Sequence, residues 1–175
     1  GRPEGARIGI LADREQVELT AELLATFQVP NVVLAPVYRL GRTPILSGTV
    51  MDALVRYLFS PARVVVVRAG DLPQWTDCKG DSLEEMRTAA AALRERGAGA
   101  VLISGGILKG RVLDVLDDGG QVTVLDSTRL NVSRVEGLAG AHAAALAGHL
   151  ARGLDLREAA AGAQRYIALR LQRGR

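Results

Sequence analysis

The sequence predicts an α/β protein of the three-layer α/β/α type, with a mostly parallel sheet and an antiparallel hairpin at one edge. Short apolar runs alternate with longer amphipathic segments, as in parallel sheets that helices cover on both faces. Four consecutive valines at 64–67 indicate a strand that is buried on both faces. Farther along, 117–120 (DDGG) separates two apolar runs and marks a hairpin. We expect residues 1–175 to form a single domain.

Three strands and two helices are expected in the first part of the chain. The apolar runs that fit strands are 7–11, 31–37 and 62–67. Asp13 and Gln16 form a capping box for a helix that ends near residue 28, and Ser47 caps a second helix that runs to residue 58. The residues expected to face the core from the first helix are Val17, Ala21, Leu24 and Phe27.

The second part continues the alternation and then changes to a hairpin followed by two helices. The apolar runs that fit strands are 100–103, 111–116, 121–125 and 132–135. Ser82 and Glu85 form a capping box for a helix that ends near Gly97. A long alanine-rich helix follows the glycine turn at 137–140, and Asp155 caps the last helix with Glu158.

The composition argues against several classes of protein. The net charge is only +3 and aromatic residues make up 3% of the chain, so a nucleic-acid surface with stacking platforms is not expected. The longest apolar runs are too short to cross a bilayer, and the single cysteine, Cys78, excludes an internal disulfide. We therefore expect a cytoplasmic protein that binds a small molecule, with neither nucleic acid nor membrane as a partner.

Ligands of open parallel sheets bind beyond the carboxyl ends of the strands. The segments expected there are 35–44, 68–80, 104–110 and 136–140. They hold or adjoin three short motifs: LPQW at 72–75, LISGG at 102–106 and GLAG at 137–140.

The order and spacing of these motifs resemble the hydroxymethylpyrimidine/phosphomethylpyrimidine kinases of thiamine biosynthesis, in the ribokinase-like superfamily. The family counterparts are Leu-Pro-Glu-Ala, Leu-x-Lys-Gly-Gly and Gly-Thr-Gly-Cys. The resemblance covers nearly the whole chain. It implies a ribokinase-like sheet and a reaction that uses ATP and Mg²⁺ to phosphorylate a pyrimidine alcohol or its monophosphate.

The resemblance also implies that this chain departs from the family at the positions that carry chemistry. Gly140 replaces the catalytic side chain of the Gly-Thr-Gly-Cys turn, and Gln74 replaces a glutamate that helps to organise magnesium. Ala35, Ser104 and Ile107 stand where the family has aspartate, lysine and histidine. The family's opening strands and its glycine-rich pyrimidine segment are expected to be missing, as in an N-terminally truncated relative. We therefore expect kinase activity that is weak or lost; the alternative is a non-catalytic ligand-sensing or subunit-interaction module.

The candidate ligand contacts come from the same segments. Backbone N–H groups at a glycine turn, together with the positive end of a helix dipole, favour a phosphate. The residues expected to bind a nucleotide or another anion are Ser104, Gly105, Gly106, Gly137, Leu138, Ala139 and Gly140. Arg39 and Arg42 are candidates for phosphate contact, the alternative being solvated loop arginines. Asp71 is the candidate metal ligand, the alternative being a turn or capping residue.

Three further side chains are expected to have structural roles. His142 and His149 are expected on a helix face rather than in catalysis, and Trp75 is expected to cover an edge of the core rather than to stack on a base. A homo-oligomer, or a partner that covers the open edge of the incomplete sheet, is also expected.

Overall fold

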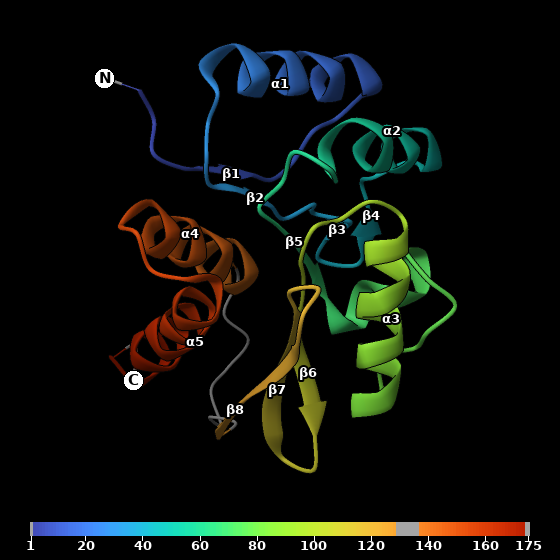
Figure 1. Cartoon of the computed structure of the whole chain (residues 1–175). Helices are drawn as coiled ribbons and strands as arrows, with labels where there is room; N and C mark the ends of the chain where they lie inside the picture. Colours follow the sequence, from blue (N-terminus) through green and yellow to red (C-terminus); the bar gives the residue numbers. More distant parts are fainter. Residues whose placement is uncertain (1, 129–136, 174–175) are drawn as a thin grey trace.

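A six-stranded sheet lies at the centre of the structure, a computed structural model that describes residues 2–128 and 137–173 (Figure 1). The strand order is β1-β2-β5-β6-β7-β8. The four parallel strands are β1 (Ala6–Ile8), β2 (Val32–Leu34), β5 (Val64–Arg68) and β6 (Val101–Leu108). The two antiparallel strands are β7 (Arg111–Asp117) and β8 (Val122–Thr128). A separate antiparallel ribbon pairs β3 (Arg39–Leu40) with β4 (Thr43–Pro44), within the segment 35–44 that was expected beyond the carboxyl ends of the strands.

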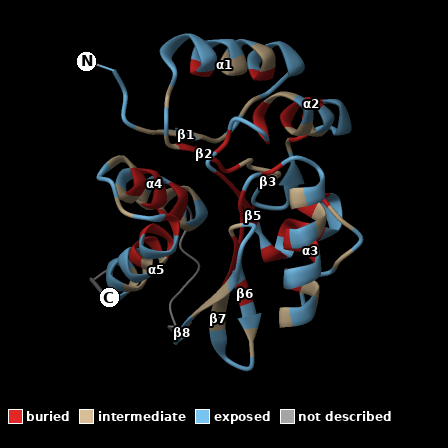
Figure 2. Ribbon diagram, in the orientation of Figure 1, coloured by how far each residue is buried: buried red, intermediate tan, exposed pale blue. Residues whose placement is uncertain are grey.

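Helices cover both faces of this sheet and complete the three layers that the sequence predicts (Figures 1 and 2). The helices of one face are α1 (Arg14–Phe27), α2 (Gly48–Leu58) and α3 (Leu83–Glu95), and those of the other are α4 (Leu138–Ala151) and α5 (Leu156–Arg173). Val65 and Val67 pack in the first core, and Val64 and Val66 pack in the second. Because side chains alternate along a strand, a strand between two helical layers must be apolar at every position, and each buried valine stabilises the fold by about 1.5 kcal/mol or more.

The predicted helix starts are confirmed. The side chains of Asp13, Ser47, Ser82 and Asp155 each accept a hydrogen bond from the backbone N–H three residues later. One core residue of α1 was predicted wrongly, because Phe27 is 56% exposed. The helix ends at Phe27, Gln28 takes a left-handed conformation, and Val29 packs against the core in its place.

The fourth strand, predicted over 100–103, extends farther than expected. β6 continues to Leu108, with a register shift between Ile103 and Gly106, and then turns into β7. Gly105 has a φ of 73°, which glycine adopts without steric cost, and this bulge lets the strand pairing resume. The strand expected at 132–135 lies outside the described residues. None of the described helices is both long enough and apolar enough to span a membrane.

Candidate functional site

Helix α4 begins at the carboxyl end of the parallel strands. A methyl group placed on Gly5, just before β1, would lie 3.2 Å from Cβ of Ala151 at the end of α4. At the other end of the helix, a methyl group on Gly140 would lie 3.5 Å from Nη2 of Arg7. The Arg7 guanidinium in turn lies against Gly9, just after β1. The helix therefore runs antiparallel to β1. Its first turn lies at the carboxyl ends of the strands, where ligands of such sheets bind; we call this end of the sheet the ligand edge.

The first turn of α4 offers backbone donors to this edge. Gly137 is the N-cap, with a φ of 78° and a ψ of 0°, and among the described side chains none caps this helix. An L side chain at Gly137 would be strained, although the space around it is open. Leu138, Ala139 and Gly140 follow in the first turn, where N–H groups have no partner within the helix. With the positive end of the helix dipole, these donors favour an anion.

Arg7 is a site residue that sequence reasoning missed. Its backbone pairs with Val33, which packs in the core beneath α4 and α5, so the Arg7 side chain lies on the α4 side of the sheet. A guanidinium beside a helix N-terminus adds a second source of positive potential at one point. The signal was a single charged residue within the apolar run RIGIL at 7–11.

Gly140 has room for a side chain. Its backbone is not in the left-handed region, and a Cβ there would make only ordinary van der Waals contacts with Arg7. The local geometry therefore accommodates a Cβ at this position. Glycine at position 140 is therefore not required by the local backbone or packing.

The three candidate residues of β6 have different environments. Ser104 is buried. Gly105 faces open space, and its N–H donates to Oδ1 of Asp114 at 2.7 Å. A Cβ on Gly106 would lie 2.6 Å from Sδ of Met86, so glycine at this position lets α3 pack closely on the sheet. Of the three, only Gly105 is exposed, and its N–H is already bonded to Asp114, so nucleotide contact by this segment stays a prediction.

A buried polar cluster lies between the Gly105 bulge of β6 and helix α4. The carboxylate of Asp114 on β7 accepts from Gly105, and its Oδ2 accepts from Nε2 of Gln164 on α5 at 3.3 Å. The same oxygen lies 3.6 Å from Nε2 of His142 on α4. Burial raises the pKa of Asp114 and lowers the pKa of His142. His142 is thus buried in the interior, and a lone acid in the apolar run 112–116 was the signal for Asp114.

Asp71 forms ion pairs with two arginines. Its side chain is 5% exposed and lies 2.7 Å from Nη2 of Arg39 and 2.7 Å from Nε of Arg68. Arg39 also donates to the carbonyl of Gly70, so both predicted ligand groups, the Arg39 guanidinium and the Asp71 carboxylate, bind protein partners. Arg42 is exposed between β3 and β4.

The described carboxylates do not gather around a site for a divalent ion. In the parts of the chain that the structure describes, no three His, Cys, Asp or Glu side chains are placed to hold a metal. Asp71 would have to leave its arginine partners to do so. Magnesium binding through Asp71 therefore stays a prediction from the resemblance, without support from the donor set.

Two residues expected to be structural are part of the packing. Trp75 is buried and stacks on Phe59, with ring centroids 6.1 Å apart. His149 is half-buried, and its ring lies where a Cβ on Gly162 of α5 would be. Both side chains therefore belong to the contacts between layers and helices.

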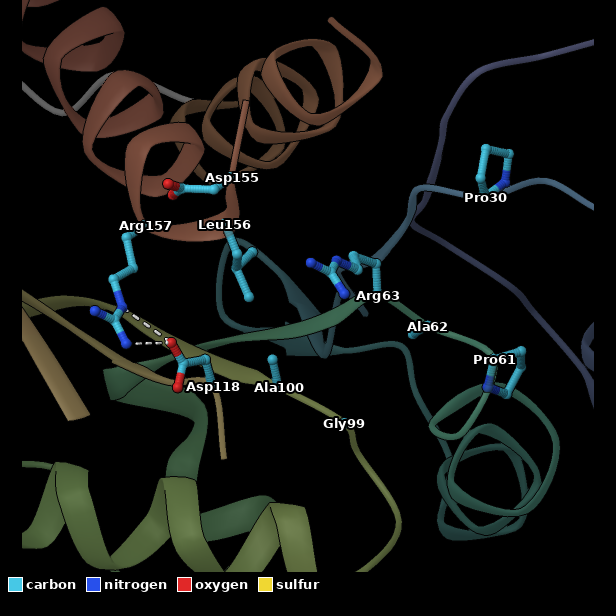
Figure 3. A pocket seen from close by; sticks show the side chains of 10 residues that line it. All are labelled: Pro30, Pro61, Ala62, Arg63, Gly99, Ala100, Asp118, Asp155, Leu156 and Arg157. Carbon is cyan, nitrogen blue, oxygen red and sulfur yellow. Dashed lines mark hydrogen bonds and ion pairs between the residues drawn. The ribbon is translucent and has the colours of Figure 1, made fainter. Parts of the chain in front are cut away.

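A hollow of about 610 Å³ lies at the opposite end of the parallel strands (Figure 3). It is bordered by residues just before β5 and β6, such as Arg63 and Gly99, and by the start of α5. Figure 3 shows Arg157 of α5 turned toward Asp118, which it binds at 2.9 Å. This hollow is at the amino ends of the parallel strands, so it is separate from the first turn of α4.

Comparison with known proteins gives consistent matches. Residues 2–174 match the family model described as phosphomethylpyrimidine kinase. A hydroxymethylpyrimidine/phosphomethylpyrimidine kinase of Streptomyces coelicolor is 30% identical over 164 residues, which cover 94% of this chain and 61% of that protein. The pyridoxal kinase of Bacillus subtilis, solved as an ADP complex, is 29% identical with a TM-score of 0.82, over 94% of this chain and 63% of that one. The pyridoxal kinase of Staphylococcus aureus in complex with ADP is 26% identical with a TM-score of 0.86, over 95% of this chain and 61% of that one.

The chain spans only 61% to 63% of the length of these three proteins. Within that span the order of helices and strands is shared, which the two TM-scores express. The ribokinase-like architecture expected from the motifs is therefore confirmed.

Proposed function

The chain belongs to the phosphomethylpyrimidine kinase family, and from this premise we propose that it binds an adenine nucleotide with the phosphates at the first turn of α4. The observation that carries the proposal is the approach of the Arg7 guanidinium to Gly140, beside the uncapped N–H groups of that turn. A guanidinium and a helix N-terminus both bind phosphate oxygens well. The ADP complexes of the two pyridoxal kinases support the nucleotide as the ligand.

The proposed reaction is phosphoryl transfer from ATP to the hydroxymethyl group of a pyrimidine, or to its monophosphate. In transfer to the alcohol, the hydroxyl oxygen forms a bond to the γ-phosphorus, the bond from that phosphorus to the β–γ bridging oxygen breaks, and ADP leaves. The hydroxyl proton must pass to a base. Most of the catalysis in such reactions comes from positioning and charge stabilisation.

We propose that this chain carries out the transfer weakly or not at all. Gly140 has no side chain at the position of the family's catalytic group, and the Asp71 carboxylate is held by two arginines. General-base catalysis contributes typically 10²–10⁴ in rate, so its loss alone explains a weak enzyme. The same two observations favour the second candidate, a ligand-sensing or subunit-interaction module that binds nucleotide without turnover.

Isothermal titration calorimetry with ADP at a fixed salt concentration tests the nucleotide proposal, because it measures the affinity for ADP. We expect Arg7→Gln to weaken ADP binding at least tenfold, about the value of one hydrogen bond to a charged group. Arg14→Gln is the matched control, because Arg14 pairs with Glu18 on the outer helix α1. The control should leave the affinity unchanged.

Three results would contradict the proposal. No detectable ADP binding by the unmodified chain at millimolar concentration would remove the nucleotide from the account. Equal ADP affinities for the unmodified chain and Arg7→Gln would place the phosphates away from α4. An effect of Arg14→Gln as large as that of Arg7→Gln would indicate a general charge effect.

A further inference from the structure

Asp114 stands where four elements of the fold meet. Its side chain is bonded to the Gly105 bulge of β6 and to Gln164 of α5, and it faces His142 of α4. Gln164 also donates to the carbonyl of Leu125 on β8, so the amide ties α5 to two neighbouring strands. Asp114 and His142 are both more than nine-tenths buried. A carboxylate in such a place is costly unless its partners satisfy it.

The facing atoms of Asp114 and His142 are not fully satisfied. Nε2 of His142 is buried and has no hydrogen-bond partner among the described residues, although Oδ2 of Asp114 is 3.6 Å away. If neither atom carried a proton, two lone pairs would face each other in an apolar core. One proton on either atom turns the contact into a donor–acceptor pair. The neutral imidazole supplies this proton when its own hydrogen is on Nε2, so the contact forms without an additional proton.

The surroundings of the pair contain no competing charge that the structure records. Gly105 presents a backbone N–H, Gln164 an uncharged amide and Leu125 a backbone carbonyl. The titratable groups that face one another are Asp114 and His142 alone among the described residues. A proton that enters or leaves the pair therefore changes the charge next to the Gly105 N–H.

We propose that Asp114 and His142 are positioning residues that couple the Gly105 bulge to the start of α4, so that two backbone segments at the ligand edge keep a fixed relative position. The inference rests on the proposed function, in which the first turn of α4 binds phosphate. Asp114 holds one segment directly through the 2.7 Å hydrogen bond from Gly105. It contacts the other through His142, which lies two residues after Gly140 on the same helix.

Two substitutions of Asp114 separate positioning from simple packing. Asp114→Asn keeps an oxygen that can accept from Gly105 but cannot titrate in this range. Asp114→Ala removes the acceptor as well. His149→Gln is the matched control, since His149 lies on the same helix but packs against Gly162 of α5.

The test combines heteronuclear NMR over a pH series without ligand with ADP titrations of the same proteins. In the unmodified chain, the Gly105 amide resonance should shift with the same midpoint as the His142 ring. Asp114→Asn should abolish that shift and leave ADP affinity within about twofold. Asp114→Ala should weaken ADP about tenfold, as expected for one lost hydrogen bond to a charged group. His149→Gln should change neither readout.

Two outcomes of this test would overturn the proposal. A Gly105 amide that does not respond while the His142 ring titrates would overturn the coupling. Equal ADP affinities for Asp114→Asn and Asp114→Ala would overturn the positioning role. If Asp114→Ala does not fold, the Gly105 shift in the unmodified chain and its loss in Asp114→Asn decide alone. If the unmodified chain does not bind ADP, the proposed function fails, whereas the amide shift still decides whether the pair couples the two segments.

Discussion

Alanine at Gly137 and alanine at Gly140 should change stability in opposite directions, although both glycines belong to the start of α4. Gly137 has a φ of 78°, where a Cβ costs about 1–2 kcal/mol, offset in part by about 0.4–1 kcal/mol of lost entropy in the unfolded chain. Gly140 is within the helix, and its Cβ would lie 3.5 Å from Arg7. Alanine there should stabilise the protein by about 0.5–1 kcal/mol. The two variants should therefore differ by about 1–2 kcal/mol in the free energy of unfolding.

Urea unfolding followed by circular dichroism measures this difference. Gly148→Ala calibrates it, because Gly148 lies in the same helix with open space around its Cα. That control should also stabilise the protein by about 0.5–1 kcal/mol. If Gly140→Ala destabilised the protein as much as Gly137→Ala, position 140 would have no room for a side chain, and the explanation of its missing catalytic group would be refuted.

Three further predictions concern a cap, a buried acid and the pH dependence of folding. Ser82→Ala removes the oxygen that caps α3, so the free energy of unfolding should fall by about 1 kcal/mol in urea, and an unchanged midpoint would argue against the cap. Asp71→Ala leaves two partly exposed arginines without their partner and should lower thermal stability by about 1–3 kcal/mol with or without magnesium; a loss confined to magnesium-containing buffer would instead support the metal role. Burial lowers the pKa of His142, so the folded protein favours the neutral imidazole, and the stability that this gives is lost as the pH falls below the ordinary value of 6.5. Burial raises the pKa of Asp114, so the folded protein favours the protonated carboxyl, and the stability that this gives is lost as the pH rises. The stability of the unmodified chain minus that of His142→Leu should accordingly decrease as the pH falls through 6.5, and a flat difference would contradict the assigned direction.

Local sequence signals predict most of the architecture. The four valines at 64–67 identify a strand between two helical layers, because each of them is buried in one of the two cores. Asp13 and Ser82 mark helix starts, since a capping hydrogen bond spans only three residues. Phe27 was misplaced although the helix end was predicted near residue 28, because the helical spacing was carried to the last residue, where Val29 beyond the left-handed Gln28 packs against the core instead.

The candidate site was harder to predict, because its contacts join elements that are far apart in the sequence. Arg7 of the sheet reaches Gly140 in the adjacent helical layer, and His142 of α4 meets Asp114 of β7. Both contacts depend on the order of strands and on which face each helix covers. A charged residue alone in an apolar strand, as at Arg7 and Asp114, was the local signal available for both. The glycine turn at 137–140 was found from the motif, since its backbone geometry is local.

The central claim is that the backbone of a kinase site is retained while its catalytic position lacks a side chain. The measurement that tests it most directly is the single-turnover rate of phosphoryl transfer from ATP to hydroxymethylpyrimidine, compared between the unmodified chain and Gly140→Cys. Gly140→Ala serves as the control, because it adds a Cβ without a titratable group. We expect Gly140→Cys to raise the rate about a hundredfold, within the usual contribution of a general base, and Gly140→Ala to leave it unchanged. Measurable transfer by the unmodified chain that Gly140→Cys does not increase would contradict the claim.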